Sequence, residues 1–384
     1  MTLRVAIDAR MIKPGSMHGI ARYVYELIRG LAIRDTGLEY FILVNRDSPL
    51  QSESWPSHIH LEQVNSAWIS FREQVEIPQI LKRRSVELFH APSFVAPLMV
   101  PCKMIMTIHD LNHLVLPQFY TPLHQLYYRV FVKSCIARST YILTVSQFSK
   151  KEIIRTLGLD TEKVFVTYNG VSQAYKPVTD QNELAYVREI YELPEEFILC
   201  VSNNKPHKNV HQLVRAYCQA KIETPLVLAT PVDRALLRLA DSFGKKHLIY
   251  FSKFIAEDHL PAVYSLTRLF VYPSTYEGFG LPPLEALCCG APVVVARSSS
   301  LPEVVGDNAI FANPYDHLDI AKALERGITN PITSHGSSDT IAEHRSKFSW
   351  DRMTEQTLQL YKSCLGVGPR PAGQDAVFHP EGAL

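Results

Sequence analysis

Short apolar segments alternate with helical patterns along most of the chain, and this alternation constrains the fold more than any other feature. Such alternation predicts parallel β-sheets covered by helices on both faces, with ligands bound at the carboxyl ends of the strands. The predicted fold class is therefore α/β. The segments predicted as strands are 5–7, 41–44, 86–89, 104–108, 141–145, 164–167, 197–201, 226–229, 248–251, 269–272, 293–296 and 309–311.

The strand pattern falls into two series. The chain has 384 residues, and 46% of them are hydrophobic. A chain of this length is too long for a single hydrophobic core, which favours two domains. The turn signal Asn169-Gly170 interrupts the pattern. We therefore predict an N-terminal domain over 1–175 and a C-terminal domain over 176–348. A terminal helix is expected near 351–364, followed by a disordered Gly- and Pro-rich tail over 366–384.

Charge and cysteine usage exclude some classes of protein. The 39 basic and 38 acidic residues give a net charge of +1, which is too small to attract nucleic acid to the whole surface and leaves only a local basic patch as an alternative. Seven cysteines without a Cys-x-x-Cys pair fit a reducing compartment. The N-terminus lacks the pattern of a signal peptide, and prolines interrupt the longest apolar region, 88–106. We expect a cytoplasmic protein.

The segment 113–138 mixes large apolar side chains with basic ones, as an amphipathic surface helix does. Most such helices pack on a sheet. The alternative is a peripheral contact between the N-terminal domain and the inner face of a membrane.

A candidate anion site lies in the stretch 273–290. A strand is predicted just before it, and Pro282 or Pro283 can occupy the first turn of a following helix. Gly278 and Gly280 allow the intervening backbone to approach a ligand closely. Free N–H groups and the helix dipole then favour a phosphate.

Two carboxylates flank the same loop. Glu277 precedes the glycines, and Glu285 follows inside the first turns of the helix. Carboxylates accept hydrogen bonds from hydroxyls, so the spacing suggests a ligand that carries both phosphate and sugar hydroxyls. The alternative is a helix whose positive end simply favours acids.

Three further side chains are predicted at the carboxyl ends of strands. Lys205 and Lys208 follow the strand 197–201 and can neutralise phosphate as point charges. His109 follows the strand 104–108, where a side chain points into the crevice above a sheet. The alternatives are a solvated basic loop and a solvated histidine.

Four motifs together resemble those of the family 4 glycosyltransferases, in particular the mannosyltransferase-like branch for polysaccharides, over residues 3–365. Glu277–Glu285 resembles the family's two glutamates separated by seven residues. Pro206–Asn209 resembles its donor-phosphate motif, and Thr107–Leu111 its sugar-site histidine. Gly19–Tyr23 resembles its N-terminal glycine loop.

The resemblance implies the GT-B fold, in which two Rossmann-like domains face one another across a cleft and a C-terminal helix, here 349–365, crosses back to the N-terminal, acceptor-side domain. It implies a retaining transfer of a hexose from a nucleoside-diphosphate sugar to a growing polysaccharide or a lipid-linked glycan. It also implies that no cofactor and no metal takes part, and the sequence contains no Asp-x-Asp. UDP-sugar and GDP-mannose donors both remain open.

The same resemblance implies roles for single residues. Glu285 would accept the ribose hydroxyls, while Glu277 and nearby backbone N–H groups would hold the donor sugar. His109 would contact that sugar from the other domain, so His109 and Glu277 are the catalytic candidates, with neither glutamate as nucleophile. Fixed donors, including the lysines, would meet the charge on the leaving diphosphate. The donor-binding candidates are Gly19, Lys205, Lys208, Phe279, Gly280, Leu281 and Glu285.

The chain departs from the family in two places. Many relatives carry arginine where Lys205 or His207 stands, which changes bidentate contacts into point charges. A glycine common near Ser252 is absent, which leaves the nucleobase contacts near Lys253 and Phe254 open.

Three other functions are alternatives to this transfer reaction. A nucleotide-sugar 2-epimerase would share the fold but act on the sugar itself, and a non-catalytic sugar-nucleotide-binding subunit would bind without turnover. A dehydrogenase is disfavoured, because no Gly-x-Gly-x-x-Gly follows the first strand.

Overall fold

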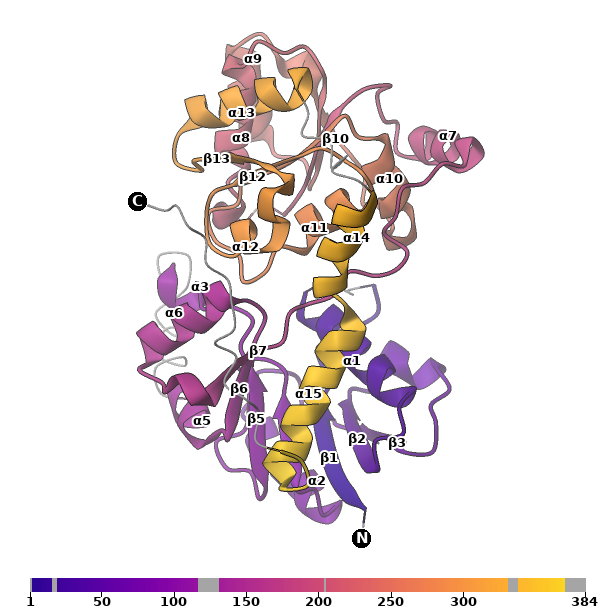
Figure 1. The fold of residues 1–384 in the computed structure, drawn as a ribbon, viewed down its shortest axis with the longest axis vertical. Coiled ribbons are helices and arrows are strands. Elements are labelled where there is room, and N and C mark those ends of the chain that lie inside the picture. Colours follow the sequence, from indigo (N-terminus) through magenta and orange to yellow (C-terminus); the bar gives the residue numbers. More distant parts are fainter. Residues whose placement is uncertain (1, 16–18, 117–130, 204, 331–337, 370–384) are drawn as a thin grey trace. The chain divides into compact units, whose positions relative to one another are not determined.

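The computed structural model describes residues 2–15, 19–116, 131–203, 205–330 and 338–369 (Figure 1). The chain forms two compact units. Unit 1 consists of Met1–Tyr168 with Trp350–Leu384, and unit 2 of Asn169–Ser349. Each unit is built on its own parallel sheet.

Unit 1 contains a seven-stranded parallel sheet with the order β3-β2-β1-β4-β5-β6-β7. The prediction missed β3, because its sequence Ile-His-Leu-Glu-Gln alternates like an edge strand instead of forming an apolar run. The strands are β1 (Leu3–Asp8), β2 (Leu38–Val44), β3 (Ile59–Gln63), β4 (Leu88–Ala91), β5 (Lys103–Thr107), β6 (Tyr141–Thr144) and β7 (Val164–Val166).

The last helix of the chain packs in the core of unit 1. Met353 and Tyr361 of α15 share a hydrophobic cluster with Leu27 of α1. Gly30 of α1 allows the close approach, since a Cβ there would lie 2.3 Å from the hydroxyl of Thr354. The crossing of the C-terminal helix back to the N-terminal unit is thus confirmed. The described α-helices of unit 1 are α1 (Ile20–Ala32), α2 (Glu73–Arg83), α3 (Asn112–Val115), α5 (Lys133–Arg138), α6 (Gln147–Leu157) and α15 (Trp350–Leu365).

Unit 2 contains a six-stranded parallel sheet with the order β10-β9-β8-β11-β12-β13. The predicted second series of strands is confirmed to within one residue at each end. The strands are β8 (Ile198–Val201), β9 (Leu226–Ala229), β10 (Ile249–Phe251), β11 (Leu269–Tyr272), β12 (Val293–Ala296) and β13 (Ile310–Ala312). The helices are α7 (Gln181–Ile190), α8 (Val210–Gln219), α9 (Arg234–Ser242), α10 (Leu260–Leu266), α11 (Leu281–Cys288), α12 (Leu301–Val305), α13 (His317–Thr329) and α14 (Ser338–Lys347).

The strand orders locate the place where each sheet can bind a ligand. In unit 1 the order reverses between β1 and β4, and in unit 2 between β8 and β11. At such a switch point the connections leave in opposite directions, so a crevice opens above the carboxyl ends of the two strands. The loops after these strands are therefore the first candidates for a site.

Two expectations fall largely outside the described residues. The segment 113–138 contains most of α3 and all of α5, but 117–130 are not described. Residues 370–384 of the expected disordered tail are not described either. Among the helices that are described, none combines the length and the apolar character needed to cross a membrane.

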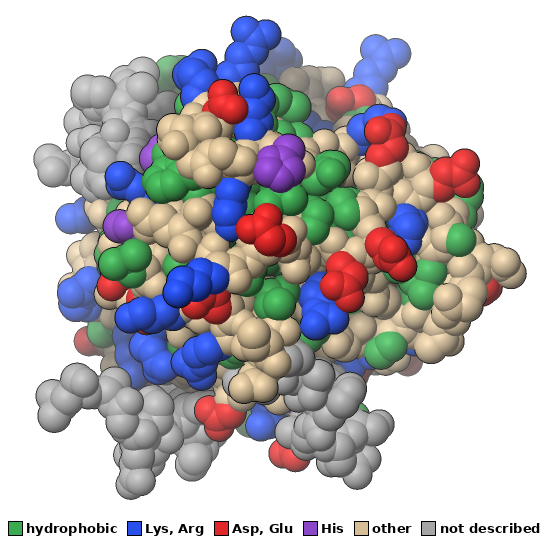
Figure 2. All heavy atoms as spheres, turned by 90° about the horizontal axis from the view of Figure 1, so that it is seen from above, with side chains coloured by type: hydrophobic (Ala, Val, Ile, Leu, Met, Phe, Trp, Pro, Cys, Tyr) green, Lys and Arg blue, Asp and Glu red, His purple; other side chains and the backbone are tan. Residues whose placement is uncertain are grey.

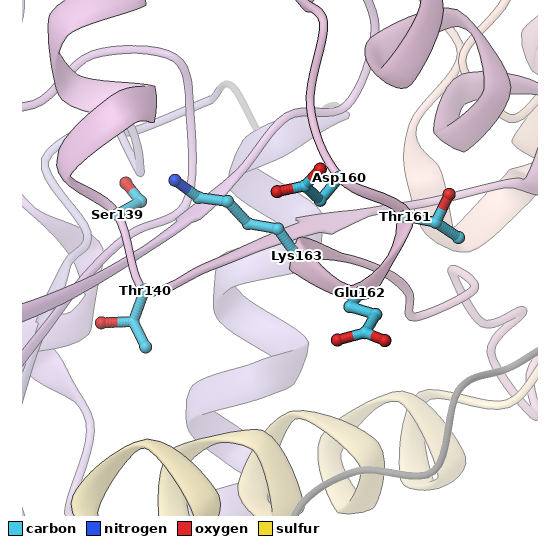
Figure 3. Close-up of a pocket in the computed structure, with 6 residues that line it drawn as sticks. All are labelled: Ser139, Thr140, Asp160, Thr161, Glu162 and Lys163. Atoms are coloured by element: carbon cyan, nitrogen blue, oxygen red, sulfur yellow. The ribbon is translucent and has the colours of Figure 1, made fainter.

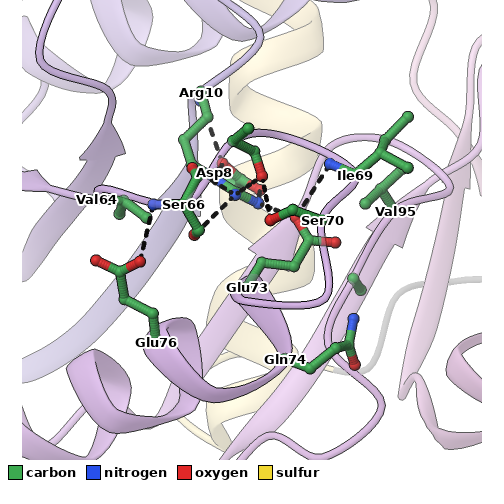
Figure 4. Close-up of polar contacts among 12 residues, drawn as sticks. Asp8, Arg10, Val64, Ser66, Ile69, Ser70, Glu73, Gln74, Glu76 and Val95 are labelled. Carbon is green, nitrogen blue, oxygen red and sulfur yellow. Dashed lines mark hydrogen bonds and ion pairs between the residues drawn. The ribbon is translucent and has the colours of Figure 1, made fainter.

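A buried ion network joins the end of β1 to the start of α2 (Figure 4). The Arg10 guanidinium donates through Nε to Asp8 Oδ1 at 2.9 Å and through Nη2 to Glu73 Oε2 at 2.9 Å. All three side chains are at most 2% exposed. Glu73 Oε2 also accepts from the N–H of Ile69, whose φ of 61° is unusual for a β-branched residue. The network thus holds the loop before α2 in a strained conformation.

A second buried polar cluster connects α15 to the centre of the sheet. His90 Nδ1 lies 2.5 Å from the Tyr361 hydroxyl, and His90 Nε2 lies 2.8 Å from Thr107 Oγ1. Burial, with a smaller contribution from His109, lowers the pKa of His90 to about 3. His90 is therefore a neutral structural histidine in the folded protein.

Arg10→Leu should strongly destabilise unit 1. The substitution leaves two carboxylates buried without their cation, which costs about 3–5 kcal/mol of the free energy of unfolding. All Trp residues, Trp55, Trp68 and Trp350, belong to unit 1, so urea unfolding followed by Trp fluorescence reports on this unit. Arg155→Leu is the control, because the Arg155 side chain is exposed and its pair with Glu152 should contribute less than about 1 kcal/mol. Equal effects of the two substitutions would contradict the assignment.

His90 should make unit 1 sensitive to acid. Its pKa is lowered from 6.5 to about 3 on folding, so the stabilisation is complete above pH 6.5 and is lost as the pH falls toward 3. The expected loss is about 1.4 kcal/mol per pH unit. The free energies of unfolding of the wild type and of His90→Gln, measured by Trp fluorescence, should therefore converge between pH 6.5 and 4. A difference that stays constant over this range would refute a neutral buried His90.

Candidate functional site

The switch point of unit 2 brings two loops of the chain together. β8 and β11 pair in parallel, so their carboxyl ends lie side by side. The loop after β8 includes the short 3₁₀ helix Pro206–Lys208, and the loop after β11 leads through Glu277 to α11. Residues about 70 positions apart in the sequence thereby become neighbours.

Lys208, Glu277 and Tyr272 form a closed triangle of polar atoms. Lys208 Nζ donates to Glu277 Oε1 at 2.6 Å and to the Tyr272 hydroxyl at 2.8 Å. The Tyr272 hydroxyl donates to the same Glu277 Oε1 at 2.9 Å. The side chains of Lys208 and Glu277 are only 14% and 13% exposed. Lys208 and Glu277, which the sequence predicts as separate site residues, are thus in direct contact.

Both members of the pair are charged at neutral pH. Burial alone would lower the pKa of Lys208, but Tyr272 and Glu277 outweigh it and raise this pKa well above its ordinary value. Burial alone would raise the pKa of Glu277, yet the Lys208 charge and the hydrogen bonds to the carboxylate lower it. Burial and the Glu277 charge raise the pKa of Tyr272, which keeps its hydroxyl protonated.

The two loops are also joined through their backbones. The carbonyl of His207 accepts from the N–H of Thr275 at 2.8 Å and from Ser274 Oγ at 3.0 Å. Asn209, in the left-handed region at φ 61°, donates from its side-chain amide to the carbonyls of Pro273 and Pro314. The position of Lys208 relative to Glu277 therefore does not depend on the ion pair alone.

The loop after Glu277 ends at the start of α11. Gly280 has a φ of 101°, and a Cβ there would lie 2.6 Å from the Leu301 side chain, so only glycine fits. Ser300 Oγ donates to the carbonyls of Glu277 and Phe279. α11 begins at Leu281 with proline in its first positions, which confirms the predicted strand, loop and helix.

The second glutamate lies within α11. Glu285 Oε2 accepts a hydrogen bond from the Tyr264 hydroxyl of α10 at 3.2 Å. Because Tyr264 is buried, its hydroxyl has a fixed place and orients the carboxylate of Glu285. Glu285 therefore has a defined position that does not involve Lys208.

Lys205 differs from Lys208. Its backbone N–H donates to Asn203 Oδ1, its side chain is exposed, and it makes no ion pair with any described residue. The structure thus brings one of the two predicted lysines, Lys208, to Glu277 and leaves the other in solvent. Near the proposed nucleobase region, Lys253 pairs with Glu192 at 2.7 Å and Phe254 is exposed.

In unit 1, His109 lies beyond the carboxyl end of β5. His109 Nε2 is 3.1 Å from the carbonyl oxygen of Pro92, and the ring lies edge-on to Tyr23 with centroids 4.9 Å apart. Burial lowers the pKa of His109 to about 4, partly offset by the Pro92 carbonyl. A carbonyl oxygen only accepts, so Nε2 carries the proton and Nδ1 keeps its lone pair.

The N-terminal glycine loop is described only in part. Gly19, with φ 54°, caps α1, and its carbonyl accepts from the N–H of Tyr23. Residues 16–18 lie outside the described residues. The prediction that Gly19 contacts a donor remains a prediction.

Some residues at these sites were not identified from the sequence. Tyr272 counts as apolar in a strand pattern, and only its place as the last residue of a strand hinted at a role. Tyr23 belongs to the Gly19–Tyr23 motif, but nothing local to Tyr23 or Pro92 indicates a contact with His109, because that contact arises from strand and helix packing. Elements far apart in the chain supply each of these contacts.

A surface hollow elsewhere in unit 1 differs from these sites (Figure 3). Figure 3 shows the Lys163 side chain extending between Ser139 and Asp160. Lys163 donates to the carbonyl of Ala137 at 3.1 Å. The lining residues Ser139, Thr140, Asp160, Thr161, Glu162 and Lys163 precede β6 and β7. The hollow is therefore at the amino-terminal edge of the sheet, opposite to the edge where ligands bind in such folds.

The surface shows no single dominant charge in the view of Figure 2, where Lys and Arg side chains are interspersed with Asp and Glu side chains. Among the described residues, no group of three or more His, Cys, Asp or Glu side chains is arranged to hold a metal ion.

Comparisons with known proteins match both halves of the chain. The family described as "Glycosyltransferase Family 4" matches residues 17–175, and that described as "Glycosyl transferases group 1" matches residues 188–345. The O-antigen chain mannosyltransferase B of Escherichia coli is 30% identical over 72% of this chain and 74% of its own length. The serotype-specific mannosyltransferase WbdA of the same species is 33% identical over 69% of this chain but only 34% of its own length.

Solved structures share the fold of almost the whole chain. Sucrose-phosphate synthase from Thermosynechococcus elongatus superposes with a TM-score of 0.75 at 18% identity, covering 95% of this chain and all of that chain. HepE from Anabaena, solved in complex with UDP and glucose, gives a TM-score of 0.74 at 19% identity and covers 94% of this chain and all of that chain. Both sheets, the returning C-terminal helix and these neighbours agree with the predicted GT-B fold. The chain belongs to the family 4 glycosyltransferases and is a glycosyltransferase.

Proposed function

We propose that this glycosyltransferase moves a hexose from a nucleoside-diphosphate sugar to a growing polysaccharide or lipid-linked glycan, with retention and without a metal ion. The names of its O-antigen mannosyltransferase relatives support a mannosyl donor such as GDP-mannose. UDP bound to HepE, which shares only the fold, keeps a UDP-sugar as the alternative. The observation that carries the proposal is the buried Lys208–Glu277 pair at the switch point of unit 2.

Lys208 is the proposed electrostatic partner of the leaving diphosphate. Its ammonium has three N–H donors, and its contacts with described residues use two of them, to Tyr272 and Glu277. The third can reach a phosphate oxygen as negative charge develops in the transition state. The N-terminus of α11 adds backbone N–H groups of Phe279, Gly280 and Leu281 on the same side of the sheet. Lys205, which is exposed, is proposed to assist as a second cation.

The two glutamates are proposed to bind different parts of the donor. Lys208 and Tyr272 both donate to Oε1 of Glu277, so Oε2 of this carboxylate lies outside the triangle and can accept from a sugar hydroxyl. Glu285, oriented by Tyr264, is proposed to accept from the ribose hydroxyls. A carboxylate engaged by an ammonium is a weak nucleophile. We therefore keep Glu277 as a binding and orienting group.

His109 is proposed to contact the sugar as a neutral acceptor. Its Nε2–H is committed to the Pro92 carbonyl, so a sugar hydroxyl can donate to Nδ1. In the proposed same-face reaction the acceptor hydroxyl oxygen bonds to the anomeric carbon as the bond to the diphosphate breaks. The hydroxyl proton passes to the departing diphosphate oxygen, so no protein base is required.

Glu277→Gln and Glu285→Gln should have opposite kinetic signatures. Loss of a hydrogen bond to a charged group costs about 1.5–3 kcal/mol, or roughly a 10- to 150-fold change. Glu277→Gln should lower the turnover number by this factor and leave nucleotide affinity nearly unchanged. Glu285→Gln should lower nucleotide affinity by this factor and affect turnover less. Nucleotide release is measured with a panel of UDP- and GDP-hexoses and a glycan acceptor, and nucleotide binding by calorimetry.

Glu196→Gln is the control for this pair of substitutions, because Glu196 is exposed and bonds only Arg268 among the described residues. It should match the wild type in both assays. Turnover of Glu277→Gln equal to that of the wild type would remove this glutamate from the site. Release of an epimerised sugar without acceptor would instead indicate epimerase chemistry, and binding without turnover a non-catalytic subunit.

A further inference from the structure

Tyr272 is the one member of the Lys208–Glu277–Tyr272 triangle to which neither the sequence nor the proposed function gives a role. It is the last residue of β11 and is 3% exposed. Its ring is stacked on that of Phe270 at 6.1 Å, and Lys208 Nζ lies 5.3 Å from the ring centroid. The strand and the core thus fix the ring, and with it the hydroxyl oxygen.

The direction of each hydrogen bond in the triangle follows from the groups themselves. A carboxylate only accepts and an ammonium only donates. The single Tyr272 proton must therefore point to Glu277 Oε1, and the hydroxyl lone pair must accept from Lys208 Nζ. Tyr272 is the only group of the triangle that both donates and accepts.

We propose that Tyr272 is a positioning residue for the transfer reaction, which holds the Lys208 ammonium and the Glu277 carboxylate at fixed places on a rigid strand. The inference rests on the proposed function of this pair. Lysine is a compact charge on a flexible stem, so an ion pair alone fixes its ammonium poorly. A second, rigid acceptor on β11 removes that freedom and keeps the third N–H aimed at one place.

The Tyr272 hydroxyl also limits how strongly the Glu277 carboxylate competes with the sugar nucleotide for the Lys208 ammonium. Oε1 accepts from both Lys208 and Tyr272, so the carboxylate shares its charge between two donors. When the third N–H of Lys208 binds a phosphate oxygen, the ammonium shares its charge with that phosphate, and Glu277 keeps its hydrogen bond to Tyr272 as further support. Without the Tyr272 hydroxyl, Lys208 would be the only partner of the triangle left to the buried carboxylate.

Tyr272→Phe tests the proposal, because it removes only the hydroxyl. We expect the turnover number to fall about 10- to 100-fold, as for an ångström-scale misplacement of a catalytic group. The KM for the donor should change less than about threefold. Tyr217→Phe is the matched control, since its buried hydroxyl bonds the Thr224 carbonyl in the same unit and does not contact the triangle. The control should keep wild-type turnover.

A double-mutant cycle with Lys208→Met separates positioning from simple packing. If Tyr272 acts by holding the Lys208 ammonium, Tyr272→Phe should lower the turnover of the Lys208→Met enzyme by less than about threefold. Independent, multiplicative losses would overturn the proposal, as would a Tyr272→Phe enzyme with unchanged turnover and only a lower melting temperature.

The same assays distinguish this proposal from the function on which it rests. A wild type that turns over none of the sugar nucleotides overturns the proposed function, and the role of Tyr272 falls with it. A wild type that turns over a donor, with Tyr272→Phe equally active, overturns only the role of Tyr272.

Discussion

The opposite charges of Lys208 and Glu277 lie largely out of water, and this pair is the constraint on which the site of unit 2 depends. Either charge alone would lower the stability of the fold at such a position, because removal of one partner from a buried pair leaves the other charge uncompensated. The pair exists because β8 and β11, which are far apart in sequence, are neighbours at the point where the strand order reverses. The topology of the sheet, more than any local motif, therefore creates the site.

Unit 1 uses the same edge of its sheet in a different way. At the corresponding reversal, between β1 and β4, the charges of Asp8, Arg10 and Glu73 satisfy one another in the interior (Figure 4). The groups that follow β4 and β5 are uncharged. The carbonyl of Pro92 fixes the tautomer of His109, and burial keeps this histidine neutral. One unit thus presents a buried charged pair, and the other a neutral hydrogen-bond acceptor.

Much of the fold could be predicted from the sequence because buried parallel strands are continuous apolar runs. The strands of unit 2 follow this rule, and β3, an edge strand with alternating polarity, does not. The placement of Lys208 and Glu277 at the carboxyl edge of the sheet could be predicted, because both are charged residues in loops that follow apolar strands. The exposed Lys205 shows the limit of that reasoning, since two lysines three residues apart in one loop can have quite different surroundings.

Tyr272 marks a further limit, and its reason is physical. In a strand pattern a tyrosine counts by its ring, which here packs in the core as expected. Its hydroxyl lies at the end of the strand and bonds Lys208 and Glu277. Lys208 comes from the loop after the neighbouring strand β8, so this contact depends on the pairing of the strands. A residue chosen for packing can thus also order the charges beside it. Because the ring and the hydroxyl of Tyr272 belong to one rigid group, packing of the ring in the core also fixes the position of the Lys208 ammonium.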